Sequence, residues 1–356
     1  MTTVINLDNP LTWNSLDSKD MAGTISEFPS QFSQSWEMTR NLDIPPFAPQ
    51  NVLILGMGGS AIGGDILRSL VADELSVPLV VHRGYHAPAF VSEKTLVLAV
   101  SYSGNTEETL AACEEARKKG ARIITYSSGG TLKERASATG NTHVTLRSGL
   151  MPRAAIGYTF LPLLVTLSKL KVIPDFASQI EETRELLKQM SRELRDTNPM
   201  EKNPAKQLAE MLYIHIPVIY ASHGFLETVA LRWKQQIHEN GKCMASCNVL
   251  PELNHNEIVG WSGANKGLEK HFGVVILREP GESARIRKRV EFTAEAVSAR
   301  ASFVKEVWAR GESRLARMFS LLYFGDFVSL YLAFLWGEDP TPIPVIDRLK
   351  QELTNG

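Results

Sequence analysis

Three hydroxyl side chains gather in one short segment that follows a run of apolar residues. Ser101, Ser103 and Thr106 lie in the segment SYSGNTEET, directly after residues 96–100, which we interpret as a buried strand. The segment opens a predicted helix, and a helix N-terminus holds anions through its free N–H groups and the positive end of its dipole. An N-capped turn would account for one hydroxyl. Three of them beside Gly104 favour a phosphate-binding turn that needs no basic residue.

A second glycine-rich segment, GMGGSAIGG, also follows a predicted strand. It matches the dinucleotide-binding pattern G-x-G-x-x-A, which calls for an acidic residue at the end of the next strand. That strand ends at His82 and Arg83, which argues against an NAD site and leaves NADP as a lesser alternative. We expect instead a tight turn in which Gly58, Gly59 and Ser60 face a sugar.

Six motifs occur in a consistent order from about residue 50 to the C-terminus. They are GMGGSAIGGD, SYSGNTEET, MPRAAIGY, RWKQQIHENGK, PELNHNEIVGW and GEDPTPIPVIDRLK. Together they resemble the bifunctional phosphoglucose/phosphomannose isomerases, which are sugar isomerases with SIS domains. SYSGNT is typical of the whole SIS superfamily, whereas NHNE and PRAA narrow the resemblance to this family. The resemblance implies that glucose 6-phosphate and mannose 6-phosphate are interconverted with fructose 6-phosphate through a cis-enediol, with no cofactor.

The implied reaction moves a proton between C2 and C1 of the sugar, which one carboxylate above one face of the substrate can do. The resemblance assigns this role to Glu239, which is predicted to end an amphipathic helix. The negative end of a helix dipole raises the basicity of a carboxylate. From composition alone, a solvated glutamate at a helix end would be the more common outcome. Arg153, in MPRAAIGY, resembles the arginine that stabilises the enediolate, a role that suits a permanently charged guanidinium.

Three further residues complete the implied site. His255, in PELNHNEIVGW, can exchange protons near neutral pH and suits ring opening. The resemblance implies that it reaches into the site of a neighbouring subunit, so that the active enzyme is a homodimer. Lys350 resembles the second ring-opening residue, although a solvated lysine near a frayed C-terminal tail would look the same. Thr341 is our candidate for a small hydroxyl residue near C2 that lets one site accept both aldoses.

Two other functions stay open at this level. An amino-sugar phosphate isomerase would share the same domains, and so would a non-catalytic SIS regulator that binds a sugar phosphate. The regulator would not need Arg153, Glu239 and His255 together. We expect no metal, because the histidines lack paired carboxylates at ligand spacing and Cys243 and Cys247 lack two further ligands.

The bulk composition excludes several classes of protein. The 356 residues are 44% hydrophobic and 22% charged, which fits two globular domains. A net charge of −1 argues against nucleic acid as a partner, and three cysteines suit a reducing compartment. Residues 318–336 are apolar enough to cross a membrane, but Gly325 and Asp326 in their middle favour a buried helix. With no signal-peptide pattern at the N-terminus, we expect a cytoplasmic protein without a membrane partner.

Strand–turn–helix alternation occurs twice and predicts an α/β fold with two SIS-type domains. Each is expected to be a mainly parallel sheet flanked by helices, as in a flavodoxin-like three-layer sandwich. The expected divisions are an N-terminal helical arm and linker (1–48), a first SIS domain (49–153), a helical connection (154–215) and a second SIS domain with a C-terminal helix and tail (216–356). The expected strands are 52–55, 79–81, 96–100, 122–126, 217–221, 243–249, 272–277 and 303–308. The expected helices are 65–72, 107–119, 225–239, 286–299 and 315–336, with an extra loop around 281–289.

Overall fold

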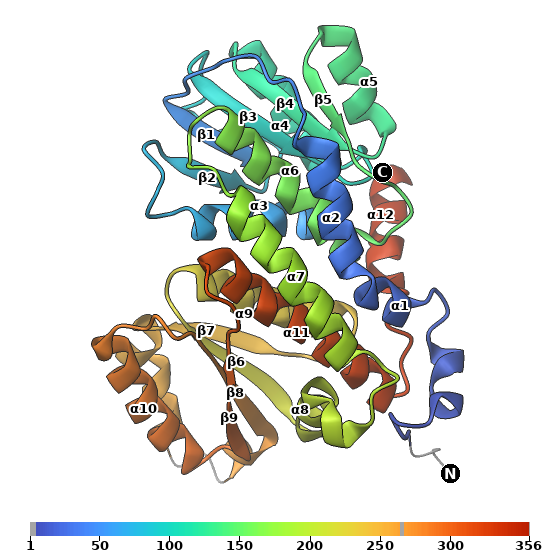
Figure 1. Cartoon of the computed structure of the whole chain (residues 1–356), viewed down its shortest axis with the longest axis vertical. Helices are drawn as coiled ribbons and strands as arrows, with labels where there is room; N and C mark the ends of the chain where they lie inside the picture. Colours follow the sequence, from blue (N-terminus) through green and yellow to red (C-terminus); the bar gives the residue numbers. More distant parts are fainter. Residues whose placement is uncertain (1–4, 264–266, 356) are drawn as a thin grey trace. The chain divides into compact units, whose positions relative to one another are not determined.

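The computed structural model describes residues 5–263 and 267–355, which belong to two compact units (Figure 1). The first unit comprises Glu27–Leu186 and Ser313–Ala316. The second comprises Met1–Ser26, Leu187–Glu312 and Arg317–Gly356. Each unit is built around one parallel sheet with helices on both faces, which confirms the predicted fold class. The finer division into an arm, two domains and a connection stays a prediction.

The sheet of the first unit has five parallel strands in the order β2-β1-β3-β4-β5. They are β1 (Asn51–Leu55), β2 (Leu79–His82), β3 (Thr95–Val100), β4 (Arg122–Ser127) and β5 (Thr142–Thr145). All residues of β3 are buried, as expected of a central parallel strand covered on both faces. The connection after β1 runs to β2 on one side, whereas the connection after β3 runs to β4 on the opposite side. The carboxyl ends of β1 and β3 therefore form a topological switch point, where open α/β sheets bind ligands.

Helices cover both faces of this sheet. Ala112, Ala116 and Leu132 bring α4 and α5 against one face, in a cluster with Leu53 and Val97. The other face carries α3 and α6, and α2 packs on α6. The bounds are α2 (Phe28–Thr39), α3 (Gly58–Leu70), α4 (Glu107–Lys118), α5 (Gly130–Thr139) and α6 (Ile156–Lys169), with α7 (Ala177–Leu194) following. Helix α5 and strand β5 had not been anticipated.

The expected turn before a helix at 65–72 is wrong, because α3 already begins at Gly58. Glycines are poor helix formers, by about 1 kcal/mol each relative to alanine. Here they permit close packing: a Cβ at Gly63 would lie 2.8 Å from the carbonyl oxygen of Thr159 on α6. Tertiary packing thus overrides local propensity, and Gly58, Gly59 and Ser60 lie in the first turn of a helix.

The second unit has four parallel strands in the order β7-β6-β8-β9. They are β6 (Ile216–Ser222), β7 (Ser246–Leu250), β8 (Phe272–Arg278) and β9 (Phe303–Trp308). This order matches the first four positions of the other sheet, β2-β1-β3-β4, and so supports a diverged duplication. Helix α10 packs on one face of the sheet and α9 on the other, where α11 fastens to α9. The helices are α1 (Met21–Ser26), α8 (Pro204–Leu212), α9 (Phe225–Glu239), α10 (Ala284–Ser298), α11 (Arg314–Leu335) and α12 (Pro344–Asn355).

Two local expectations in this unit are corrected. Residues 284–289 of the loop expected at 281–289 are helical, because α10 begins at Ala284. Ser283 caps this helix by accepting the Ile286 N–H at 3.3 Å. The strand expected from residue 243 begins only at Ser246. The C-terminal tail is also a helix, α12, which begins at Pro344.

Helix α11 is, in the described part of the chain, the one helix long and apolar enough to cross a membrane. Of its most apolar 18-residue window, 89% is buried inside the fold, as in the core helix of a soluble protein. Asp326 in its middle pairs with Arg232 of α9 at 2.9 Å. The expectation of a buried helix is therefore confirmed.

Within the second unit, a buried lysine binds the N-terminal segment to helix α8. The side chain of Lys206, on α8, is fully buried and donates to the carbonyl oxygens of Leu7 and Asp196 at 2.8 and 2.9 Å. It also pairs with Asp8 Oδ1 at 2.9 Å. All three ammonium protons thus have acceptors from two distant parts of the chain.

We expect Lys206→Met to lower the free energy of unfolding by about 3 kcal/mol, since it leaves two carbonyls without this donor and leaves the Asp8 carboxylate with the Met200 N–H as a partner. Urea unfolding followed by circular dichroism measures the change. Lys288→Met is the matched control, because the Lys288 side chain is exposed and its ion pair with Glu291 is long, at 3.7 Å. Equal stability of the two variants would contradict the anchoring role of Lys206.

Candidate active site

Both small-residue motifs of the first unit lie at the topological switch point. The segment after β1 enters α3, and the segment after β3 forms the turn from Ser101 to Thr106 that opens α4. One hydrogen bond joins them: the Tyr102 N–H donates to Ser60 Oγ at 3.0 Å. Both partners are buried. The Ser60 hydroxyl therefore braces the two motifs against each other.

Ser101 shapes the phosphate-binding candidate from inside. Its side chain is fully buried, and its Oγ accepts the N–H groups of Gly104 and Thr106 at 3.1 and 3.3 Å. The Ser101 and Thr106 hydroxyls also lie 2.8 Å apart. Gly104 has φ +78°, and a Cβ there would lie 1.8 Å from the Gly129 carbonyl oxygen. Ser103 is exposed, and Thr106 is half-buried at the N-cap of α4, with its hydroxyl beside that of Ser101.

The first turn of α4 contains Glu107 and Glu108, whose carboxylates oppose the positive potential of the helix N-terminus. The Glu107 carboxylate accepts a hydrogen bond from the Tyr85 hydroxyl at 3.4 Å. An anion at this turn would therefore be held by N–H and O–H donors rather than by net charge.

Arg153 lies beside the first turn of α3. It belongs to the short helix η3 (Pro152–Ala154) and is 3% exposed. A Cβ at Gly59 would lie 2.8 Å from the Pro152 carbonyl oxygen and 2.9 Å from the Arg153 nitrogen. Gln31 of α2 donates to the Ala154 carbonyl at 2.9 Å and fixes the other side of η3.

The segment that leads to Arg153 is bound to the phosphate-binding candidate as well. The Tyr102 hydroxyl donates to the Arg147 carbonyl at 2.8 Å and accepts the Leu150 N–H at 3.1 Å. The structure therefore brings Gly58, Gly59, Ser60 and Arg153 together with the Ser101–Thr106 turn. Tyr102 ties these pieces together, but nothing in its sequence pattern identified it.

Arg83, which had left NADP as an alternative, is paired with Asp65 of α3. The Asp65 carboxylate is buried, whereas the Arg83 side chain is 37% exposed. A guanidinium committed to a buried carboxylate is neutralised locally and makes a poor partner for a 2′-phosphate. The switch point therefore lacks the recognition group that a dinucleotide site would need on β2.

In the second unit, a polar seam fixes the helix that ends at Glu239. Arg232 and Gln236 bind the two carboxylate oxygens of Asp326 on α11 at 2.9 and 3.0 Å. Asn240 donates to Ser329 Oγ at 3.0 Å. Residues 232, 236 and 240 follow one face of α9 at spacings of four. Because this face is bound to α11, the rotation of α9 about its axis is set, and with it the direction of Glu239.

Lys242 links the end of α9 to the segment that carries Thr341. Its ammonium donates to the carbonyl oxygen of Glu239 and, at 3.3 Å, to that of Pro340. Thr341 is 4% exposed, and its N–H donates to Asp339 Oδ1 at 2.9 Å. Two of the predicted site residues thus lie in one neighbourhood. Lys242, with φ +51°, had not been singled out.

His255 lies at the other end of the second sheet from Glu239. It is exposed in the short helix η5 (Glu252–His255), which follows β7, whereas Glu239 precedes β7. The five residues of β7 separate the two edges by about 13 Å at 3.3 Å per residue. Glu239 and His255 of one chain thus lie toward opposite ends of β7.

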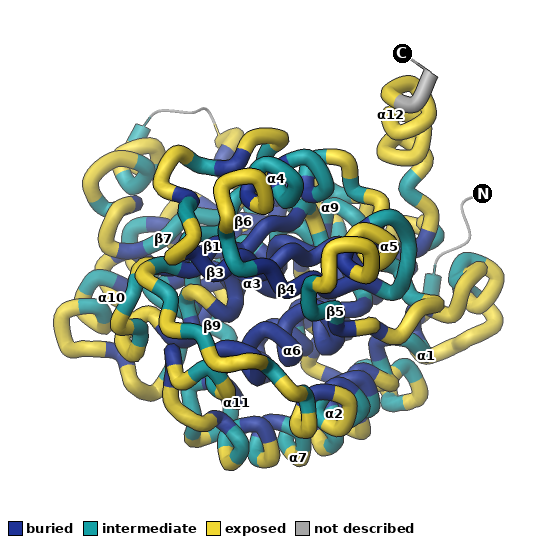
Figure 2. Tube along the Cα trace, turned by 90° about the horizontal axis from the view of Figure 1, so that it is seen from above, coloured by how far each residue is buried: buried dark blue, intermediate teal, exposed yellow. Residues whose placement is uncertain are grey.

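Lys350 lies on α12 rather than in a frayed tail, so that part of the expectation is wrong. Its side chain is 68% exposed and 3.8 Å from Asp347, a weak surface pair. Figure 2 shows α12 exposed over residues 344–353, the part of the helix whose burial the structure describes. Its apolar residues Val345, Leu349 and Leu353 follow one another at spacings of four and are more than half exposed.

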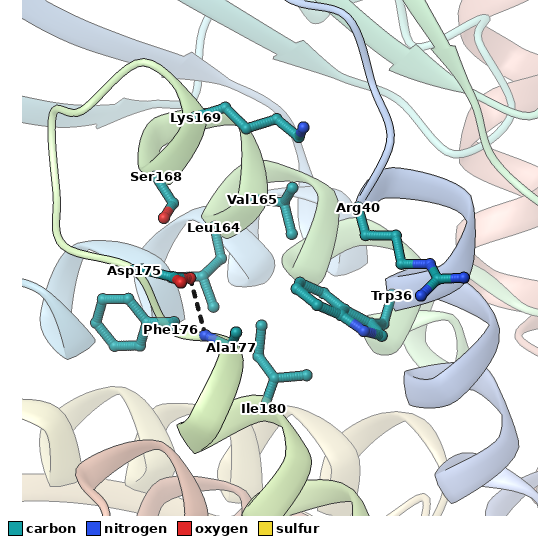
Figure 3. A pocket seen from close by; sticks show the side chains of 10 residues that line it. All are labelled: Trp36, Arg40, Leu164, Val165, Ser168, Lys169, Asp175, Phe176, Ala177 and Ile180. Atoms are coloured by element: carbon teal, nitrogen blue, oxygen red, sulfur yellow. Dashed lines mark hydrogen bonds between the residues drawn. The ribbon is translucent and has the colours of Figure 1, made fainter.

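A cavity of 320 Å³ lies among α2, α6 and α7 in the first unit (Figure 3). Its lining combines apolar side chains, such as Trp36 and Val165, with Arg40 and Lys169. The Asp175 carboxylate on its wall accepts the Ala177 N–H at 3.0 Å. None of the predicted site residues lines this cavity, so it is separate from the candidate site at the switch point.

Comparison with known families divides the chain into two matching parts. Residues 48–151 match the SIS domain, and residues 201–353 match the bacterial phospho-glucose isomerase C-terminal SIS domain. A bifunctional phosphoglucose/phosphomannose isomerase from Caldicellulosiruptor bescii is 45% identical over 94% of this chain and 98% of its own length. One from Thermoplasma acidophilum is 38% identical over 85% of this chain and 90% of its own.

The chain belongs to the bifunctional phosphoglucose/phosphomannose isomerase family. It is therefore an enzyme, an isomerase with two SIS domains. A more distant relative is a D-glucosamine-6-phosphate 4-epimerase from Sulfolobus acidocaldarius, 33% identical over 64% of this chain and 70% of its own length. Among solved structures, a hypothetical protein from Thermus thermophilus has a TM-score of 0.75 at 17% identity and covers 95% of the isomerase and 90% of its own chain, a likeness of fold.

No group of three or more His, Cys, Asp or Glu side chains that could hold a metal ion occurs among residues 5–263 and 267–355 of the isomerase. Its three cysteines are free thiols. Burial raises the pKa of Cys113 to about 11 and also raises the pKa values of Cys243 and Cys247. These thiols are therefore protonated at neutral pH and poorly suited to bind metal or to act as nucleophiles.

Proposed function

We propose that this isomerase interconverts glucose 6-phosphate and mannose 6-phosphate with fructose 6-phosphate through a cis-enediol, without a metal ion. The observation that supports it most directly is the joining of Arg153 to the Ser101–Thr106 turn at the switch point of the first sheet. A phosphate at the turn and a cation beside it suit a substrate that carries an anion at one end and develops a second during reaction.

In the proposed mechanism the substrate is held by its phosphate. Ser103, Thr106 and the N–H groups at the start of α4 donate to it, while Ser101 maintains the turn. Gly58, Gly59 and Ser60 line the path of the sugar. Glu239 removes the proton from C2 of the open aldose and returns it to C1, and the Arg153 guanidinium stabilises the negative charge that develops on the enediolate oxygens.

Acceptance of two aldoses follows from the shared intermediate. Glucose 6-phosphate and mannose 6-phosphate differ only at C2, and the cis-enediol has lost that difference. Rotation about C2–C3 lets the same carboxylate protonate either face of C2. Thr341 is the proposed neighbour of C2, because a small side chain leaves room for this rotation.

We further propose a homodimer in which His255 serves the site of the neighbouring subunit. Supporting this, Glu239 precedes β7 and His255 follows it, and the five residues of β7 span about 13 Å. His255 and Lys350 then open the ring of the cyclic substrate, one by protonating the ring oxygen and one by taking the proton from the anomeric hydroxyl. The free thiols support a cytoplasmic location.

The amino-sugar alternative keeps one supporting observation, the likeness to a D-glucosamine-6-phosphate 4-epimerase. It is tested in the same assay as the main proposal. The regulator alternative would leave unexplained why the helix that ends at Glu239 is bound to α11 through three side chains.

The deciding experiment offers fructose 6-phosphate and scores glucose 6-phosphate and mannose 6-phosphate with separate coupling enzymes. We expect both aldoses to form, and EDTA to leave both rates unchanged, since Glu239 and Arg153 replace the roles of a metal. Loss of activity in EDTA that added metal restores would overturn the metal-free mechanism. Turnover of glucosamine 6-phosphate but not of fructose 6-phosphate would favour the amino-sugar alternative.

A further inference from the structure

A carboxylate that the mechanism does not use is held by two neighbouring strands of the second sheet. Tyr220 on β6 and Asn248 on β7 are paired in register, so their side chains lie on the same face of the sheet. The Glu257 carboxylate bridges them: Oε1 accepts the Tyr220 hydroxyl at 2.5 Å and Oε2 accepts the Asn248 amide at 2.6 Å. The Tyr220 hydroxyl in turn accepts the Trp261 Nε1–H at 2.8 Å.

The direction of these hydrogen bonds is well defined. Tyr220 is fully buried, and burial together with the neighbouring Glu257 raises the pKa of its phenol. Tyr220 therefore keeps its proton and donates a hydrogen bond to the Glu257 carboxylate. Asn248 Oδ1 accepts the Val249 N–H at 2.8 Å, which leaves the Asn248 amide nitrogen as the group that faces Glu257.

The two residues before His255 are fixed, whereas His255 itself is exposed. Leu253 is fully buried in the core beneath α10. Asn254 donates to Thr293 Oγ1 at 2.8 Å and accepts from Arg289 at 3.1 Å, both on α10. The His255 ring makes no hydrogen bond or ion pair within residues 5–263 and 267–355, and the residue is exposed. A rigid loop thus presents one imidazole to its surroundings.

We infer that Glu257 is a positioning residue, whose bridge to Tyr220 and Asn248 holds the loop so that the His255 imidazole is presented for ring opening. This inference rests on the proposed function of His255. Asn254 fixes the loop on the side before His255, and Glu257 fixes it on the side after. Loss of the contacts on either side of His255 would allow the imidazole to move away from its position. A displacement of a catalytic group by about 1 Å can lower the rate by up to 10²-fold.

The test compares a substrate that must be opened with one that is always open. Fructose 6-phosphate closes to a furanose through its C5 hydroxyl, whereas 5-deoxy-fructose 6-phosphate lacks that hydroxyl and stays open. Deuterium incorporation from solvent at C1, followed by proton NMR, reports proton transfer for both. The variants are Glu257→Gln, whose amide has one acceptor oxygen instead of two, and Tyr220→Phe, which removes one donor. Glu291→Gln, on an exposed part of α10, is the control.

We expect Glu257→Gln and Tyr220→Phe to lower kcat/KM for fructose 6-phosphate by about 10-fold, while exchange on the 5-deoxy compound stays near the wild-type rate. His255→Ala should show the same pattern with a larger loss, and Glu291→Gln should show none. Two results would overturn the inference. One is unchanged turnover of fructose 6-phosphate in both Glu257→Gln and Tyr220→Phe, and the other is an equal loss on both substrates in these variants. A wild-type enzyme that exchanges neither compound would instead reject the proposed function.

Discussion

Glu239→Gln should abolish isomerisation while the protein still binds sugar phosphate. The amide is nearly the same size as the carboxylate but cannot accept the C2 proton, so kcat should fall on the order of 10³- to 10⁴-fold. The proposed phosphate-binding turn belongs to the other unit, and this substitution does not change it. The dissociation constant of fructose 6-phosphate, measured by calorimetry, should therefore stay close to that of the wild type.

The control for this variant lies on the same helix. Glu227 stands in the first turn of α9, where its exposed carboxylate pairs with His223 at 2.9 Å. Glu227→Gln makes the same chemical change far from the proposed site and should leave kcat unaltered. Because Arg232 and Gln236 still bind Asp326 in both variants, neither should lose much stability in urea. Near wild-type turnover in Glu239→Gln would show that another group is the base.

The fold was predictable where buried strands give continuous apolar runs. Strand β8, FGVVILR, is buried from Gly273 to Arg278, and its prediction differs from the structure by one residue. Helix α5 gave no such signal, because it buries only Leu132 and Ala136 against an edge of the sheet. Edge strand β5 buries Val144 alone. Elements that bury so few residues give only a weak apolar pattern in the sequence, so they could not be predicted from it.

The turn that opens α4 was predictable, because its hydroxyl residues are concentrated in the one short segment from Ser101 to Thr106. The residues that hold the site together could not be found in this way. Tyr102, Lys242 and Glu257 act through partners up to about a hundred residues away, and their own neighbours in sequence give no sign of it. The early start of α3 could not be predicted from its own residues either. Its glycines are explained by close packing on the Thr159 carbonyl of α6, which is distant in sequence.

The two sheets share an order but differ at their switch points. In the second sheet, β8 ends at Arg278, whose buried guanidinium binds Glu282 at 2.7 Å and also contacts Glu306. The Trp308 ring covers this guanidinium, with 4.5 Å between the Arg278 Cζ and the ring centroid. Internal ion pairs thus fill the edge that carries the open serine and threonine turn in the first sheet. The first sheet therefore carries the proposed phosphate-binding turn at this edge, whereas the second carries a cluster of ion pairs there.

Arg153→Lys should lower kcat by about 10²- to 10³-fold, with a smaller change in KM. Lysine keeps the charge but not the planar pair of donors, so two enediolate oxygens can no longer be bound together. A five-carbon aldonate phosphate, whose carboxylate mimics the enediolate, should lose more affinity for the variant than fructose 6-phosphate does. Arg147→Lys is the matched control, since Arg147 is exposed and contacts Gln34.

Gly59→Ala gives a second route to the same result with Arg153 intact. The added Cβ would lie 2.8 Å from the Pro152 carbonyl, so η3 must move away from α3 and carry Arg153 with it. If the guanidinium acts on the enediolate, this variant should lose kcat and aldonate affinity in parallel with Arg153→Lys, although it removes no charged group. If Gly59→Ala lowers only the stability in urea and leaves kcat unchanged, the position of Arg153 is not what the reaction depends on.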